Sequence, residues 1–184
     1  MKNIALALTL AFLAAACARP PVQEIAAAQT AINAAVQAGA EDYAIDDLRS
    51  SRDTLTMANT EVEAKAYKDA RVSALDAKAK AEAAAAAVEV GKAYAKAKAE
   101  TGITGVQTLL ADINTLLANP KLKGTSALKE EAKELGTQVD GMKTSYDAGK
   151  YKIVCDNIPA LQNLSTDLKT RVEEASKKKP AKKK

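Results

Sequence analysis

Apolar residues recur every three or four positions along most of this chain, and no segment alternates apolar and polar residues with a period of two. Such spacing places the apolar side chains on one stripe of an α-helix. The pattern is interrupted at Gly39, Thr101-Gly102, Asn119-Pro120 and Gly149. These interruptions and the stripes between them predict six helices, over residues 22–38, 42–64, 67–100, 105–118, 126–147 and 150–175.

Local signals refine two of these helices. Thr104-Gly105-Val106-Gln107 has the Thr and Gln spacing of a capping box, so we expect a helix to start there. Pro159 lies inside the last predicted helix. It is expected to kink that helix near residues 155–159, because proline cannot donate a backbone hydrogen bond.

The predicted stripes differ in bulk. Between Tyr67 and Val88 the stripe is almost entirely alanine, which lets a neighbouring helix approach closely, whereas larger side chains concentrate in residues 103–172. Short amphipathic helices bury their stripes against one another, so we predict an all-α fold, an antiparallel bundle of about six helices. An oligomeric coiled coil is the alternative. Interruptions roughly every 20–30 residues favour a bundle within one chain.

A weak internal repeat appears at an offset of 84 residues, where Ala64-Lys65-Ala66-Tyr67-Lys68 aligns with Ala148-Gly149-Lys150-Tyr151-Lys152. We predict an Ala-rich helical unit over residues 22–101 and a second helical unit over residues 102–176. One interpretation of the repeat is that these are duplicated three-helix units. The other is a chance alignment of two heptad patterns. The same shift places Ile25, Ile32, Leu48, Leu55 and Val62 on Leu109, Leu116, Ala132, Val139 and Tyr146.

Composition narrows the chemistry that the chain can perform. Alanine accounts for 41 of the 184 residues, and the chain contains no His and no Trp. The absence of His excludes Ser-His-Asp and Cys-His catalysis and His-ligated metal sites. The sequence also lacks a Gly-rich phosphate loop and Cys/His metal spacing. We therefore predict that the protein is not an enzyme and needs no cofactor or metal.

The first residues have the organisation of an export signal. Met1-Lys2-Asn3 supplies a positive charge, and the apolar run Ile4–Ala16 is too short to span a membrane as a helix. Ala14-Ala15-Ala16-Cys17 resembles a bacterial lipobox, whose cysteine becomes the lipidated first residue of the mature protein, although Ala14 replaces the usual Leu. We predict a signal peptide over residues 1–16 and a lipidated linker over residues 17–21.

Lipidation of Cys17 would anchor the protein to a membrane, because several acyl chains hold a protein stably where one chain is marginal. By resemblance to enterobacterial lipoproteins, Ala18 rather than Asp after the cysteine implies sorting to the outer membrane, facing the periplasm. The alternative is ordinary signal-peptidase cleavage after Ala16 or Ala18. That cleavage would leave a soluble periplasmic or secreted protein.

Charge is divided unevenly along the chain. Residues 17–176 hold 20 basic and 23 acidic residues, whereas the last eight residues hold six lysines and no acid. A mildly acidic body does not indicate nucleic-acid binding. We expect a disordered basic tail over residues 177–184 that either solubilises the chain or contacts anionic lipid or peptidoglycan through Lys177, Lys178, Lys179, Lys182, Lys183 and Lys184. This end faintly resembles Braun-type lipoproteins, in which a terminal lysine is joined to peptidoglycan.

Three short motifs follow one another within residues 26–87, about a third of the chain: Ala31-Ile32 with Ala35, Tyr43-Ala44 with Leu48, and Ala64-Lys65-Ala66-Tyr67 with Ala70. Together they resemble a family of uncharacterised Ala-rich helical domains in bacterial envelope lipoproteins, often found with OmpA-like peptidoglycan-binding domains. The chain departs from the family pattern at Ile45, where Pro is usual, and at Lys65, where Gly is usual. The resemblance implies an envelope location and a helical fold, and it carries over no catalytic or ligand-binding residue.

Other candidate residues have plain structural interpretations. Cys155 is expected to be a small apolar residue beside Val154, or otherwise one half of an intermolecular disulfide. The five tyrosines are expected to pack half-buried against the helices. Adjacent acidic residues point about 100° apart on a helix, so the following pairs are expected to be solvated rather than catalytic: Glu41-Asp42, Asp46-Asp47, Glu130-Glu131 and Glu173-Glu174.

Two functional hypotheses follow from these observations. The first is an outer-membrane lipoprotein with a structural, spacer or docking role in the periplasm, held at the membrane by its lipid and contacting an unidentified protein. The second is a periplasmic binding or chaperone-like module for a lipid or protein client.

Overall fold

The computed structural model of the protein describes residues 19–177, which form helices and no strand. The predicted signal peptide, Cys17 and the tail lysines after Lys177 lie outside these residues. The helices of the described region are α2 (Val22–Ala38), α3 (Ala40–Tyr43), α4 (Ile45–Glu63), α5 (Tyr67–Leu117), α6 (Ser126–Asp147) and α7 (Tyr151–Lys177). The all-α helical bundle predicted from the periodicity is confirmed.

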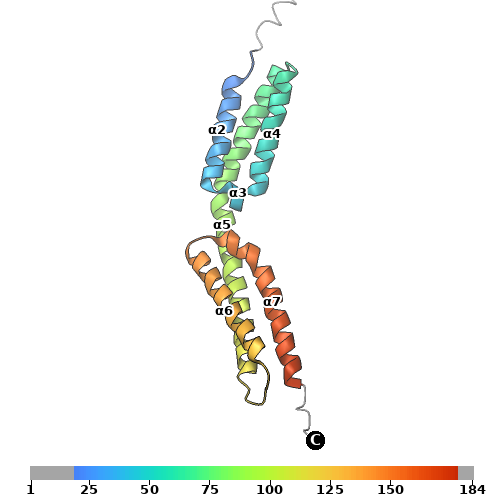
Figure 1. Ribbon diagram of the computed structural model, residues 1–184. Coiled ribbons are helices and arrows are strands. Elements are labelled where there is room, and N and C mark those ends of the chain that lie inside the picture. Colours follow the sequence, from blue (N-terminus) through green and yellow to red (C-terminus); the bar gives the residue numbers. More distant parts are fainter. Residues whose placement is uncertain (1–18, 178–184) are drawn as a thin grey trace, which may run out of the picture. The chain divides into compact units, whose positions relative to one another are not determined.

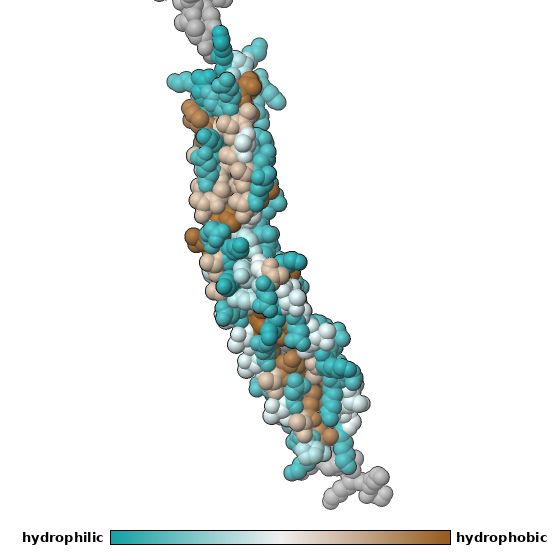
Figure 2. Space-filling model, turned by 90° about the vertical axis from the view of Figure 1, so that its left-hand side faces the viewer, coloured by the Kyte–Doolittle hydropathy of each residue, from teal (hydrophilic) through white to brown (hydrophobic). Residues whose placement is uncertain are grey.

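The chain divides into two compact units after Gly91. Unit 1 contains α2, α3, α4 and residues 67–91 of α5, and unit 2 contains residues 92–117 of α5 together with α6 and α7. In each unit, two antiparallel helices lie beside their part of α5 (Figure 1). The surface of each unit drawn in Figure 2 carries a narrow tan and brown band between teal polar side chains. Each unit is therefore a bundle of three long helices with its own apolar stripe.

Unit 1 has a thin core built largely from alanine. Ala28, Ile32 and Ala35 of α2 are buried, as predicted for its stripe. The predicted alanine stripe of α5 is confirmed, since the following residues are fully buried: Ala70, Ala74, Ala77, Ala81 and Ala84. The small side chains allow Ser51 Oγ of α4 to donate a hydrogen bond to the carbonyl oxygen of Ala77 at 2.8 Å. Close helix approach rather than side-chain bulk thus builds this core.

Unit 2 holds the larger apolar side chains, as the sequence predicted. Its core brings together residues of α5, α6 and α7, namely Ala99, Ile103, Val106, Ile113, Leu117, Ala132, Leu135, Val139, Met142, Val154, Ile158, Leu161, Leu168 and Val172. At roughly 25 cal/mol per Å² of buried apolar surface, such side chains stabilise a bundle more per residue than alanine does.

The predicted interruption at Thr101-Gly102 is wrong, because α5 runs without a break through both residues. Thr101 and Thr104 donate side-chain hydrogen bonds to the carbonyl oxygens of Ala97 and Glu100, each four residues earlier, so Thr104 is not a helix cap. Gly102 is required for close packing instead. A Cβ at this position would overlap the side chain of Ile158 on α7.

The remaining helix boundaries agree closely with the sequence interpretation. The bounds of α2 and α6 match the prediction, and Pro159 lies inside α7, which continues past it to Lys177. The first residue of the predicted disordered tail is therefore helical. The short helix α3 was missed: Gly39, with φ +101°, ends α2, and the chain turns again at once with Ala40 buried.

The repeat at an offset of 84 residues is visible in the turns that precede the last helix of each unit. Lys65 and Gly149 both adopt a left-handed conformation, with φ of 59° and 74°. The backbone bonds around them correspond one by one, each shifted by 84: Ala64 to Thr60 and Ala148 to Thr144, Lys65 to Val62 and Gly149 to Tyr146, Ala66 to Glu61 and Lys150 to Ser145. Both turns are Schellman motifs.

Burial follows the same register. We call α4 with residues 67–91 of α5 the first hairpin, and α6 with α7 the second hairpin. The pairs buried in both are Leu48/Ala132, Ser51/Leu135, Leu55/Val139, Ala58/Met142, Ala70/Val154, Ala74/Ile158, Ala77/Leu161, Ala81/Ser165, Ala84/Leu168 and Val88/Val172. The repeat does not extend to the first helix of each unit, because Ala28 and Ala35 are buried whereas Asp112 and Asn119 are exposed.

Candidate docking groove

The second hairpin carries an open groove between α6 and α7. Two adjoining hollows of about 440 and 290 Å³ share Gln138 and Leu164 and together extend from Glu130 to Ser145 on α6. At 1.5 Å of rise per residue, that stretch of helix is about 22 Å long. We call this feature the α6–α7 groove.

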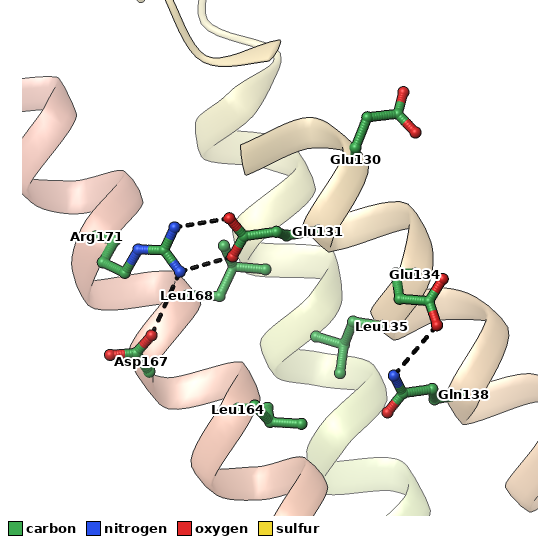
Figure 3. Close-up of a pocket in the computed structure, with 9 residues that line it drawn as sticks. All are labelled: Glu130, Glu131, Glu134, Leu135, Gln138, Leu164, Asp167, Leu168 and Arg171. Atoms are coloured by element: carbon green, nitrogen blue, oxygen red, sulfur yellow. Dashed lines mark hydrogen bonds and ion pairs between the residues drawn. The ribbon is translucent and has the colours of Figure 1, made fainter. Parts of the chain in front are cut away.

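The floor of the α6–α7 groove is apolar. Leu135 of α6 and Leu168 of α7 are 4% exposed and belong to the core of unit 2. Leu164 is 54% exposed, and in Figure 3 it points from α7 toward the space where Leu135 lies, with α5 behind them. Ile153 at the other end of the groove is 52% exposed. The groove thus offers apolar surface to solvent at its centre and at one end.

A three-residue ion-pair cluster bridges the rim at one end of the groove. The guanidinium of Arg171 on α7 donates two hydrogen bonds to the Glu131 carboxylate on α6, at 2.6 and 2.7 Å, and a weaker one to Asp167 at 3.5 Å (Figure 3). These bonds lower the pKa of Glu131 below its ordinary value and raise the pKa of Arg171 above its own. Both groups therefore stay charged at neutral pH.

The groove has a surplus of negative charge. Its lining holds the carboxylates of Glu130, Glu131, Glu134 and Asp167 against the single guanidinium of Arg171. Arg171 is engaged by Glu131 and Asp167, and Glu130 pairs at 3.9 Å with Lys133, which lies outside the lining. Glu134 accepts only a long hydrogen bond from Gln138, at 3.4 Å. At neutral pH the formal charge of this lining is negative.

The first hairpin carries a hollow of about 380 Å³ at the equivalent positions of α4, and its lining is polar except for Met57, namely Asp46, Arg49, Ser50, Asp53, Thr54 and Met57. There Lys80, which corresponds to Leu164, donates to Thr54 Oγ1 at 2.9 Å and pairs with Asp76 at 2.9 Å. Thr54 and Ser73 are each 6% exposed, whereas their counterparts Gln138 and Asn157 are exposed and line the groove. The correspondence of buried positions between the hairpins fails at these residues, and the apolar floor with the exposed Leu164 distinguishes the hollow of unit 2 from that of unit 1.

The predicted site residues contribute little to this groove. Cys17, Lys178, Lys179, Lys182, Lys183 and Lys184 lie outside the described residues, and Lys177 is an exposed residue at the end of α7. The acidic residues of the groove were predicted to be solvated, and Glu130 is; Glu131, however, pairs with Arg171 across two helices. The sequence contained one signal for the groove. Leu164 is a bulky apolar residue next to Ser165, which belongs to the buried stripe of α7, so Leu164 itself lies outside that stripe and is exposed.

The remaining candidates behave as structural residues. Cys155 is partly buried, its thiol donates to the Ala95 carbonyl oxygen at 3.3 Å, and burial raises its pKa. The Tyr146 and Tyr151 rings meet edge to face at 5.2 Å across the turn. Four tyrosines are half-buried as predicted, but Tyr94 is 71% exposed.

The part of the chain that the structure describes contains neither a candidate metal site nor a candidate membrane span. Nowhere between residues 19 and 177 do three Asp, Glu or Cys side chains come together in a way that would hold a metal ion. None of the helices in the same range combines the length and hydropathy of a membrane span.

Comparisons of the chain with protein-family models, curated protein sequences and solved structures found no match. The resemblance of residues 26–87 to Ala-rich domains of envelope lipoproteins therefore stays a prediction.

Proposed function

We propose that this protein is a bacterial envelope lipoprotein, anchored to the outer membrane through Cys17, whose helical units serve as a docking surface in the periplasm. The lipobox-like start, the single positive charge before it and Ala18 after the cysteine support the location. Slim three-helix units with their polar surfaces support a structural or docking role more than a catalytic one.

The α6–α7 groove is the observation that carries the docking role. Exposed leucine and isoleucine side chains are ordinary when scattered singly. Here Leu164 and Ile153 lie in one continuous hollow above an apolar core, with a polar rim on both sides. Apolar surface surrounded by a polar rim is typical of sites where proteins bind other proteins.

Membrane anchoring is tested by labelling cells with palmitate and separating their membranes. The unchanged protein and a Cys155→Ser variant are expected to carry label and to sediment with the outer membrane. A Cys17→Ser variant is expected to lose both properties. An unlabelled wild-type protein in the soluble periplasmic fraction would contradict the proposal. Mass spectrometry of the same material reports any muropeptide on the C-terminal lysines.

A periplasmic carrier of a lipid or protein client is the second candidate, and the exposed apolar floor of the α6–α7 groove is the observation that favours it. Native mass spectrometry separates the two roles. A carrier is expected to co-purify with a bound lipid or polypeptide, whereas a docking protein is expected to appear at the mass of its own chain.

A further inference from the structure

We propose that the α6–α7 groove binds a cationic amphipathic helix of a partner protein, with the apolar face of that helix on Leu135 and Leu164. The inference rests on the proposed docking function and specifies the chemistry of the partner.

A helix fits the groove better than an extended strand. The groove lies between two antiparallel helices of a three-helix unit, and a fourth helix laid along it would complete a four-helix bundle. Its length of about 22 Å accommodates about 15 residues of helix. The exposed apolar side chains at its centre and its end, Leu164 and Ile153, are 11 residues apart on α7, which corresponds to about three turns of such a helix.

Charge selects a cationic occupant. The rim presents Glu134, Glu130, which is 3.9 Å from the exposed Lys133, and Asp167, which is 3.5 Å from Arg171. The one guanidinium of the lining is held mainly by Glu131, so four carboxylates face one basic group in the lining. A second copy of the chain placing its own α6–α7 groove here would bring two acidic rims together, which is unfavourable. Lysine or arginine side chains flanking the apolar face of the bound helix would complement the rim.

The basic C-terminal residues of the chain itself would complement the negative charge of the α6–α7 groove but not its apolar floor. Residues 178–184 contain lysines, Pro180 and Ala181, and no large apolar side chain that would cover Leu164. The partner must supply both apolar and basic side chains on one helix, and this combination distinguishes it from the tail.

The first hairpin shows the same scaffold with a hollow whose lining is polar except for Met57. Lys80 reaches across to Thr54 of α4 and pairs with Asp76 on its own helix, so the position of the exposed Leu164 is taken by a charged side chain with partners of its own. The second hairpin replaces this bridge with Leu164 and an exposed Gln138. The structure thus offers a matched internal control for every measurement on the groove.

The probe is a synthetic 18-residue amphipathic helix with leucine on one face and lysine on the other, and its binding to the purified full-length protein is measured by fluorescence anisotropy. A scrambled peptide of the same composition and a peptide with glutamate in place of lysine serve as controls. We expect saturable binding of the amphipathic cationic peptide alone, and weaker binding as ionic strength rises. No binding of this peptide, or equal binding of the scrambled or acidic peptide, would overturn the proposal.

Two pairs of variants locate the site. Leu164→Asn is expected to weaken binding about tenfold, whereas Leu75→Asn, at a leucine of similar exposure (51%) in unit 1, should leave it unchanged. Glu134→Lys is expected to weaken binding about fivefold, and Glu89→Lys, an exposed residue of unit 1, serves as its charge-matched control. Equal effects within either pair would contradict binding at the groove. Circular dichroism confirms that each variant is folded.

Other occupants would give distinct results. A dimer that sediments as such and is dissociated by Leu164→Asn would assign the groove to a second copy and overturn the proposal. A peptide that binds only after the lysines of residues 177–184 are changed to glutamine would assign the groove to the tail. These measurements use purified protein and do not depend on Cys17, so their failure is distinguishable from failure of the membrane anchor.

Discussion

The ammonium group of Lys80 donates a hydrogen bond to Thr54 Oγ1 at 2.9 Å, and this bond bridges α4 and α5 where the second hairpin is open. The residues equivalent to this pair in the second hairpin are Leu164 and Gln138, and both are exposed. Two hairpins with the same turn and ten matched pairs of buried residues therefore differ at this surface, and that difference defines the candidate docking site.

The paired turns predict opposite effects of glycine. Lys65 has φ 59°, a left-handed conformation that costs a residue with a Cβ about 1–2 kcal/mol. Lys65→Gly is expected to raise the free energy of unfolding by about 1 kcal/mol. Gly149→Lys, at the equivalent turn with φ 74°, should lower it by about 1–2 kcal/mol.

Urea denaturation followed by circular dichroism measures both effects, and Lys68→Gly in the first turn of α5 is the control, expected to destabilise. A destabilising Lys65→Gly would contradict the equivalence of the turns.

Gly102 predicts a packing clash. A Cβ there overlaps Ile158, which is 7% exposed, so Gly102→Ala is expected to destabilise unit 2 by about 1–3 kcal/mol despite the better helix propensity of alanine. At Gly105 the nearest atom to an added Cβ is Gln162 Nε2 at 3.8 Å, an ordinary contact. Gly105→Ala should therefore stabilise by about 0.5–1 kcal/mol. Melting temperatures of the two variants that shift in the same direction would refute this assignment.

The Arg171–Glu131 pair predicts a pH-dependent contribution to stability. Because the folded pKa of Glu131 lies below its ordinary value of 4.5, the pair stabilises unit 2 above about pH 4.5 and stops doing so as pH falls through the lowered folded pKa. Arg171→Gln should therefore have a lower melting temperature than the wild type at pH 7, and the gap between the two melting temperatures should disappear as the pH falls. The gap is expected to be small, because both side chains are nearly half exposed.

Arg49→Gln is the control for this titration, since Arg49 contacts Asp46 through a single atom pair at 3.2 Å with both side chains largely exposed. It should show no pH-dependent gap. A gap for Arg171→Gln that widens under acid would reverse the sign of the proposed interaction.

Cys155 is predicted to react slowly with thiol reagents. Burial raises its pKa above the ordinary value of 9.0, and the thiolate is the reactive form. Alkylation by iodoacetamide, quantified on the Cys155 peptide by mass spectrometry, should rise only at a higher pH than that of a cysteine in an unfolded peptide. Rapid labelling at pH 7, or recovery of the residue as an intermolecular disulfide, would contradict a packed structural thiol.

Periodicity predicted most of the fold because the spacing of apolar residues is enough to identify a helix and the stripe of side chains that it buries. The bounds of α2 and α6 follow from it directly. The prediction of a break at Thr101-Gly102 was wrong because glycine occurs both where a helix ends and where a helix packs closely against a neighbouring side chain, here that of Ile158. The sequence alone does not distinguish these two cases. The short helix α3 was missed because four residues are too few to show a period.

The docking groove was harder to predict than the fold. Glu131 and Arg171 are 40 positions apart in the sequence. The spacing of residues within one helix therefore does not predict their contact. The repeat provided a clue, since aligning Lys80 with Leu164 shows a charged residue replaced by an apolar one at an exposed position. Interpreting that substitution required the structure of both hairpins.

The central claim, that the second hairpin docks a cationic helix and the first does not, is tested most directly by methyl NMR of the full-length protein during titration with the amphipathic cationic peptide. The account predicts shifts confined to methyl groups of the groove, at Leu135, Met142, Leu164 and Leu168. Leu48, Leu55 and Leu75 of unit 1 should not move. Shifts of equal size in both hairpins, or shifts confined to unit 1, would contradict the claim.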